Sequence, residues 1–199
     1  SKENFFQDRA HASQHASQIS GMLTRLPSDW MKKGLIKKVV IKLCNKICEE
    51  GFFDKDKVHA TQHASQIAGM LSVLSFEELP EEVVKGAVIK ISQLVSKSDF
   101  RSDKRPAQLV SQLSRMVGQL PPELLMESPV KEVVSRICNE VCEEGFFDKD
   151  QVHAAQHVSQ IAGMLSVFPS EDLGIFPMKD AVEKICDKIS AGTLLNASD

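Results

Sequence analysis

Aromatic side chains and long apolar runs are both scarce in this sequence. Its 199 residues include one tryptophan and no tyrosine, although these two aromatic residues dominate the energetic hot spots of protein interfaces. No stretch reaches the 18 or more consecutive apolar residues that indicate a transmembrane helix. We therefore expect no membrane span.

A secretory signal and an excess of basic charge are missing as well. Lys2, Glu3, Asp8 and Arg9 stand where a signal peptide needs apolar residues. The 24 basic residues are balanced by 27 acidic ones, for a net charge of -3, so the chain lacks the basic field that holds nucleic acid. We expect an intracellular protein, in the cytoplasm, with no nucleic-acid partner.

An internal repeat organises the chain. Three nearly identical segments, QHASQISGML, QHASQIAGML and QHVSQIAGML, occupy 14–23, 62–71 and 156–165, and a degenerate fourth copy, SQLSRMVGQL, occupies 111–120. A longer match pairs 43–73 with 137–167 at 25 of 31 positions, with a constant offset of 94 residues. The pattern indicates a duplicated pair of units.

Each unit is predicted to form two helices, which gives an all-α fold. The expected architecture is a tandem array of four helical hairpins, α-solenoid-like, with about eight helices. Gly51 and Gly145 stand where a left-handed residue ends the second helix of a unit, and Asp54 is the expected cap of the helix that follows. In this arrangement the two helices joined at Gly51 lie side by side.

The four units are assigned to one helical-repeat domain, 1–199. Their approximate limits are 4–50, 51–99, 100–144 and 145–192, and the polar segment 96–106 is the expected bend. Both ends of the sequence fall close to a turn between helices, and neither resembles the polar capping unit that closes an array. We expect adjacent repeats of a longer parent chain.

Small residues recur every four positions in the first helix of each unit. Stripes such as Ala12-Ala16-Ser20 and Ala60-Ala64-Ala68 allow two helix backbones to approach closely. A glycine shared by the four segments (Gly21, Gly69, Gly118 and Gly163) costs about 1 kcal/mol relative to alanine in mid-helix. We expect it to answer a packing need, with inheritance from one ancestral unit as the alternative.

All six histidines and four of the five cysteines occur in pairs four residues apart, a spacing that places each pair on one helix face about 5–6 Å apart. At two junctions a cysteine pair precedes a histidine pair. The predicted ligand sets of two structural zinc ions are Cys44, Cys48, His59 and His63 for the first, and Cys138, Cys142, His153 and His157 for the second. The two pairs of each set are expected to face one another across the turn.

The remaining pairs are incomplete. His11 and His15 have no cysteine pair before them, and Cys186 has no histidine pair after it, so both places are expected to hold no metal. At the middle junction the corresponding positions are Ser92 and Ser96, followed by Gln108 and Gln112. The cysteine pair and the histidine pair are therefore absent together.

A metal-free interior is the alternative to zinc, because free cysteine packs as a small apolar residue and a neutral histidine bonds its neighbours. Disulfides do not fit, since Cys44 and Cys48 would close a very short ring and the cysteine count is odd. This composition favours a reducing compartment. A calcium loop at 53–57 is excluded because His59 and Ser65 stand where glycine and glutamate are needed.

The expected function is that of a non-enzymatic helical-repeat scaffold that binds another protein. No nucleophile elbow, phosphate-binding glycine loop or metalloprotease motif occurs. The alternative is a carrier that encloses an apolar ligand or haem between its helices, with paired histidines as axial ligands. Six lysines between 32 and 46 could meet an anionic surface, although a solvated outer face is the simpler interpretation.

Overall fold

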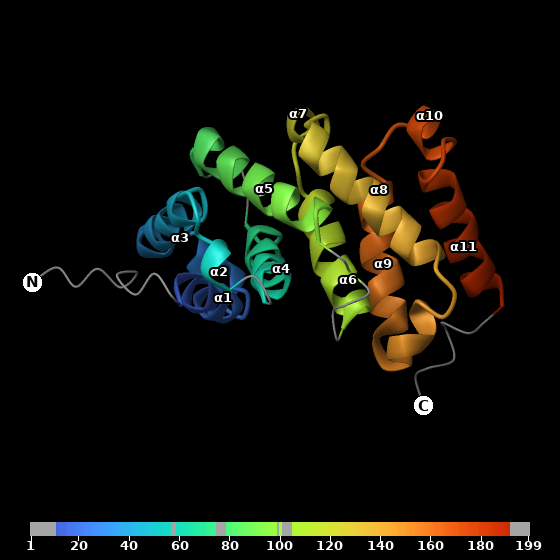
Figure 1. Ribbon diagram of the computed structural model, residues 1–199, viewed down its shortest axis with the longest axis horizontal. Helices are drawn as coiled ribbons and strands as arrows, with labels where there is room; N and C mark the ends of the chain where they lie inside the picture. The colour runs from blue at the N-terminus through green and yellow to red at the C-terminus, as the bar shows by residue number, and fades with distance from the viewer. Residues whose placement is uncertain (1–10, 57–58, 75–78, 99, 101–104, 192–199) are drawn as a thin grey trace, which may run out of the picture. The chain divides into compact units, whose positions relative to one another are not determined.

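The computed structural model describes residues 11–56, 59–74, 79–98, 100 and 105–191, and within these ranges the chain is all-α (Figure 1). It divides into two compact units, 1–98 and 99–199. The division falls inside the segment expected to bend, part of which (99 and 101–104) lies outside the described residues. Each unit is described by itself.

The first unit contains four longer helices. These are α1 (Ala12–Leu23), α3 (Gly34–Ile47), α4 (Ala60–Leu71) and α5 (Glu81–Ser96). The one-turn helix α2 (Ser28–Met31) precedes α3, and the 3-10 turn η1 (Asp54–Asp56) precedes α4.

The second unit repeats this order of elements and has one more one-turn helix before its last long helix. Its longer helices are α6 (Pro106–Val117), α8 (Ser128–Cys142), α9 (Ala154–Leu165) and α11 (Met178–Ser190). The short elements are α7 (Pro122–Leu125), the 3-10 segment η4 (Phe147–His153) and α10 (Ser170–Leu173). The described residues therefore form eight helices of twelve or more residues, the number that the sequence predicts, together with one-turn helices that it does not.

The predicted hairpins of α4 with α5, α6 with α8 and α9 with α11 are in contact, but the largest helix contacts join other helices. In the first unit α1 packs on α4, α3 packs on α5, and α4 and α5 join the two pairs. The second unit pairs α6 with α9 and α8 with α11 in the same way. The helices that follow one another at Gly51, α3 and α4, make few contacts, so the expectation that they lie side by side is wrong.

The connection after α3 explains this pairing. Gly51 has φ +73°, and Gly145 has φ +72°, so both adopt the left-handed conformation expected of them. Phe52 and Phe53 follow, both buried, with their rings 4.8 Å apart edge to face. The connection is long enough to bury two aromatic rings and add the turn η1, so it carries the chain away from α3 before α4 starts.

The helices α4 and α9 begin later than expected. Asp54 lies in the turn η1, whereas the N-cap of α4 is His59. In the same way α1 begins after His11 and α9 after His153. None of these three histidines makes a side-chain cap hydrogen bond of its own.

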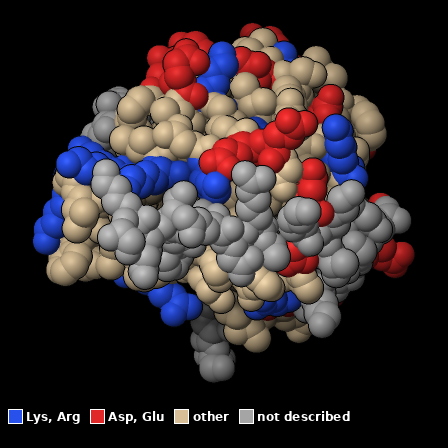
Figure 2. All heavy atoms as spheres, turned by 60° about the vertical axis from the view of Figure 1, so that its left-hand side comes forward, with Lys and Arg blue, Asp and Glu red and all other residues tan. Residues whose placement is uncertain are grey.

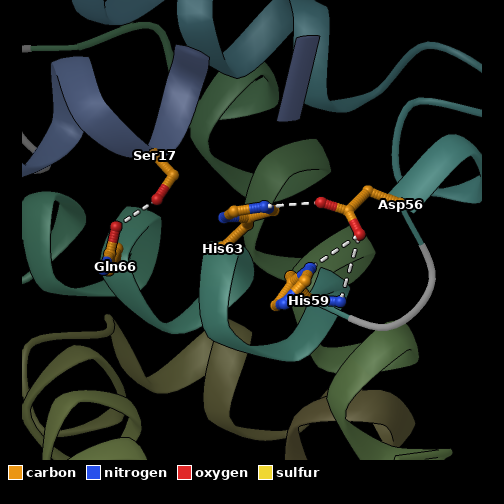
Figure 3. Close-up of polar contacts among 5 residues, drawn as sticks. All are labelled: Ser17, Asp56, His59, His63 and Gln66. Atoms are coloured by element: carbon orange, nitrogen blue, oxygen red, sulfur yellow. Dashed lines mark hydrogen bonds and ion pairs between the residues drawn. The ribbon is translucent and has the colours of Figure 1, made fainter. Parts of the chain in front are cut away.

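The stripes of small residues are buried where α1 meets α4, as expected. Ala16, Ser20, Ala64 and Ala68 are fully buried. Across this contact Ser17 Oγ donates a hydrogen bond to Gln66 Oε1 (Figure 3). The two helices are therefore held by buried small residues and by this hydrogen bond, which we call the polar lock.

The equivalent lock in the second unit corrects the sequence register of α6. There Ser111 Oγ donates to Gln160 Oε1, and in both units donor and acceptor are 49 residues apart. Ser111 therefore corresponds to Ser17 at the 94-residue offset. Aligning the helices on Gly21 and Gly118 instead shifts α6 by three residues from this register. In this register Arg105, the N-cap of α6, takes the place of a capping histidine, rather than Gln108.

The shared glycines do not answer one packing need. A Cβ placed on Gly21 or Gly163 would meet nothing within 4 Å. A Cβ on Gly118, at the end of α6, would lie 3.3 Å from the carbonyl oxygen of Gly163 on α9. The packing expectation is therefore wrong for Gly21 and Gly163, whereas Gly118 stands at a close approach of two backbones.

The lengths of the helices bear on the expectation of no membrane span. In the ranges that the structure describes, no helix combines enough residues with enough apolar character to cross a bilayer.

Candidate functional site

A carboxylate joins the histidine pair at the start of α4. Asp56, in the turn η1, lies between His59 and His63 (Figure 3). Its Oδ1 is 3.0 Å from His59 Nδ1, and its Oδ2 is 3.1 Å from His63 Nε2. The backbone N–H of His59 donates to the same Oδ1 at 3.3 Å. Because an ionised carboxylate only accepts, both imidazole nitrogens that face it carry a proton.

The second unit repeats this arrangement at the start of α9. Asp150 Oδ1 is 2.9 Å from His153 Nδ1, and Asp150 Oδ2 is 3.1 Å from His157 Nε2. Asp150 also has non-helical backbone angles within η4. We call the two groups the Asp56 cluster and the Asp150 cluster, each consisting of the aspartate and its two histidines.

Burial differs sharply within each cluster. His63 is only 8% exposed and His157 is buried as well, whereas His59 and His153 are exposed. The Nδ1 atoms of His63 and His157 are buried without a hydrogen-bond partner. The aspartate is therefore the polar partner of an otherwise enclosed imidazole, while the second histidine closes the cluster toward solvent.

The histidines stabilise the ionised form of each aspartate. Hydrogen bonds from His59 and then from His63 hold the pKa of Asp56 below its usual value, against a partial desolvation that acts to raise it. The pKa of Asp150 is lowered by hydrogen bonds from His153 and His157. Both carboxylates are consequently negative near neutral pH and suited to accept from imidazole.

The cysteine pairs are directed elsewhere. A Cβ on Gly86 of α5 would lie 3.0 Å from Cys48 Sγ, so this thiol rests against α5. Burial raises the pKa of Cys48, and Lys90 on α5 acts to lower it. Burial and then Asp180 on α11 raise the pKa of Cys142, which Lys184 on α11 acts to lower. This direction follows from the pairing of α3 with α5 and of α8 with α11.

Burial also keeps the inner thiols protonated. Cys44 and Cys138 are fully buried, and desolvation followed by the neighbouring cysteine raises the pKa of each to about 12. All five cysteines are free thiols, of which Cys48 and Cys186 are exposed. Zinc binds the thiolate form, so a zinc ion at these cysteines would have to displace the proton of each thiol.

The eight predicted zinc ligands therefore divide into separate groups. The structure brings His59 to His63 and His153 to His157, each pair on an aspartate, and leaves the cysteines on the neighbouring helix pair. Within the described ranges no three histidine, cysteine, aspartate or glutamate side chains are placed to hold a metal ion. The residues do not fit a Cys2His2 centre, and zinc binding stays a prediction that this geometry does not favour.

Asp56 faces Nε2 of His63 but Nδ1 of His59, so each imidazole has its other ring nitrogen off the carboxylate, and haem binding stays a prediction. The aspartates are not part of the pairs four residues apart from which the site was predicted. A longer pattern, D-x2-H-x3-H, occurs at Asp56 and Asp150, and also at Asp8 with His11 and His15. Asp8 lies outside the described residues.

Exposed apolar side chains form the other notable feature. Trp30 of α2 is 49% exposed and Leu35 of α3 is 73% exposed. Around them the segment 28–47 contains six lysines and a single acidic residue, Asp29. Lys33 Nζ lies 3.9 Å from the centroid of the Trp30 ring, within the range of a cation–π interaction.

Comparison with known proteins does not assign this chain to a family: no family model matches it, and no curated protein or solved structure is significantly similar.

Proposed function

We propose that the chain is a non-enzymatic helical scaffold that binds another protein through the exposed side of α2 and α3. We call this surface the basic face, and its exposed residues are Trp30, Lys32, Lys33, Leu35, Lys38 and Lys42. In Figure 2, which brings the α3 side of Figure 1 forward, basic side chains gather in a band at the left of the view.

The exposure of the single tryptophan carries the proposal. Trp30 and Leu35 are large apolar side chains that lie exposed close together in the sequence, and tryptophan is enriched among interface hot spots. Leu35, Lys38 and Lys42 follow one another at intervals of three and four residues, so they share one side of α3. An apolar anchor beside a row of like charges is suited to an amphipathic, acidic protein segment.

The Asp56 and Asp150 clusters have a structural role in this proposal. Each cluster ties a turn to the first turn of the following helix, which positions α4 or α9 on its neighbour. The free thiols favour a reducing compartment, since Cys48 and Cys186 are exposed and unpaired in disulfides.

Site-specific photo-crosslinking tests the proposal. A photoreactive amino acid at Leu35 should capture a protein in the cells that produce the chain, and the captured protein, once purified, should bind the chain saturably. Glu81 is an exposed position on α5, outside the basic face, and serves as the control. Equal labelling from Leu35 and Glu81, or a captured protein that still binds after Trp30→Ala and Leu35→Asp, would show that the basic face is not the binding surface.

A further inference from the structure

The exposed side of α10 and α11 in the second unit is acidic. Segment 170–190 contains five carboxylates and three lysines. We call its exposed residues the acidic face: Glu171, Asp172, Ile175, Phe176, Asp180, Glu183, Asp187 and Ile189. Of the three lysines, Lys188 Nζ is bonded to Asp148 at 3.0 Å, and Lys179 Nζ lies 3.7 Å from Glu183.

Like the basic face, the acidic face begins with exposed apolar residues. Phe176 is 69% exposed immediately before α11, as Leu35 is at the start of α3. Charged residues follow on the same side of each helix, Lys38 and Lys42 after Leu35, and Asp180 and Glu183 after Phe176. The order of apolar anchor and charge is therefore the same on both helices, and the charges are of opposite sign.

The geometry points to head-to-tail self-association, in which the basic face of one copy of this chain binds the acidic face of a second copy. This inference rests on the proposed function and names its partner. Both faces carry charged residues four positions apart, Lys38 and Lys42 on α3 and Glu183 and Asp187 on α11, which is a rise of about 6 Å on each helix.

The positions of the charges select an antiparallel arrangement of the two helices. Lys38 then lies opposite Asp187 of the second copy and Lys42 opposite Glu183, and Leu35 lies beside the exposed Ile189. In a parallel arrangement with Leu35 opposite Phe176, Lys38 would lie opposite Lys179, and the two like charges would repel. The antiparallel pair also places Asn45 opposite Asp180.

Such a contact uses two different surfaces, so it leaves a basic face free on one copy and an acidic face free on the other. Heterologous contacts of this kind build rings or open filaments rather than a closed dimer. A pairing of two basic faces is opposed by the repulsion of their lysines. The association should weaken as added salt screens the charges.

Sedimentation velocity of the purified chain is the test. At low salt the weight-average mass should rise above that of the 22.0 kDa chain as concentration increases, and it should fall again at high salt. Lys38→Glu/Lys42→Glu and Glu183→Lys/Asp187→Lys should each leave a monomer. The chain with all four substitutions should associate again, because both charges are reversed together.

Lys97→Glu/Lys131→Glu is the matched control, since it makes the same charge change at exposed lysines outside both faces. Circular dichroism establishes that each variant is folded. A wild-type chain that stays monomeric at low salt overturns the inference, as does a four-substitution chain that stays monomeric although folded. Binding to vesicles containing phosphatidylserine by a monomeric chain would assign the basic face to a membrane surface and likewise overturn it.

Disulfide trapping tests the orientation. In a Cys48→Ser/Cys186→Ser background, Asn45→Cys/Asp180→Cys should form an intermolecular disulfide, and neither single cysteine variant should. In a Cys48→Ser background, trapping of Asn45→Cys through Cys186 instead would overturn the antiparallel arrangement. If the photoreactive amino acid at Leu35 captures a different protein while the purified chain remains monomeric, the self-association fails and the proposed function stands. If it captures no protein, both fail.

Discussion

Replacing Asp56 by alanine should lower the free energy of unfolding of the first unit by about 2–4 kcal/mol. Asp56 accepts hydrogen bonds from both imidazoles and from the His59 backbone. His63 is buried and its Nδ1 already lacks a partner, so the variant leaves both ring nitrogens unpaired, at a cost of about 1–3 kcal/mol. Losing a carboxylate that accepts from the helix N-terminus costs about 1 kcal/mol more.

Urea unfolding at neutral pH, followed by circular dichroism and by the emission of Trp30, measures this loss. Asp54→Ala is the matched control, because Asp54 lies exposed in the same turn, and surface substitutions of this kind change stability by about 0.5 kcal/mol or less. Equal effects of the two variants would refute the role of the carboxylate. If the purified chain instead contains stoichiometric zinc, and Cys44→Ser loses both the zinc and stability, the zinc assignment would be restored.

Other predictions concern packing, acid stability and thiol reactivity. Gly21→Ala should raise stability by about 0.5–1 kcal/mol in thermal unfolding, because the added Cβ meets open space in mid-helix. Gly118→Ala should lower stability, since its Cβ presses on the α9 backbone. A Gly118→Ala variant more stable than Gly21→Ala would contradict the contact between α6 and α9. Because folding lowers the pKa of both cluster aspartates, their stabilisation is complete above their usual pKa of 3.8 and is lost as pH falls below it, so Asp56→Ala/Asp150→Ala should flatten the acid end of the stability profile. Cys186 should react with a thiol reagent far faster than Cys44 in the folded chain, and equal rates would show that Cys44 is not enclosed.

The number of long helices and the positions of the glycine turns could be predicted from the sequence because they depend on local signals. Periodic apolar residues mark the helices, and Gly51 has no Cβ to oppose a positive φ. The pairing of α1 with α4 and of α3 with α5 could not be predicted in this way. It depends on which apolar stripes meet after the chain has passed Phe52 and Phe53, and this is a property of the whole unit.

The candidate site was predicted only in part. The histidine pairs do form compact groups, but their partner is Asp56 or Asp150 rather than a cysteine pair. Spacing alone cannot decide this, since a cysteine at the end of α3 is able to face either α4 or α5. The register of α6 was missed for a related reason: Gly118 resembles Gly21 in sequence, while the contact that fixes the helix is made by Ser111.

The central claim, that the basic face is the partner-binding surface, is tested most directly by the fluorescence of Trp30. This residue is the only tryptophan and the chain has no tyrosine, so the emission reports one position on that face. On titration with the protein captured from Leu35, we predict a blue shift and protection from acrylamide quenching that saturate together with binding measured by sedimentation. Saturated binding with unchanged emission and unchanged quenching would contradict the claim.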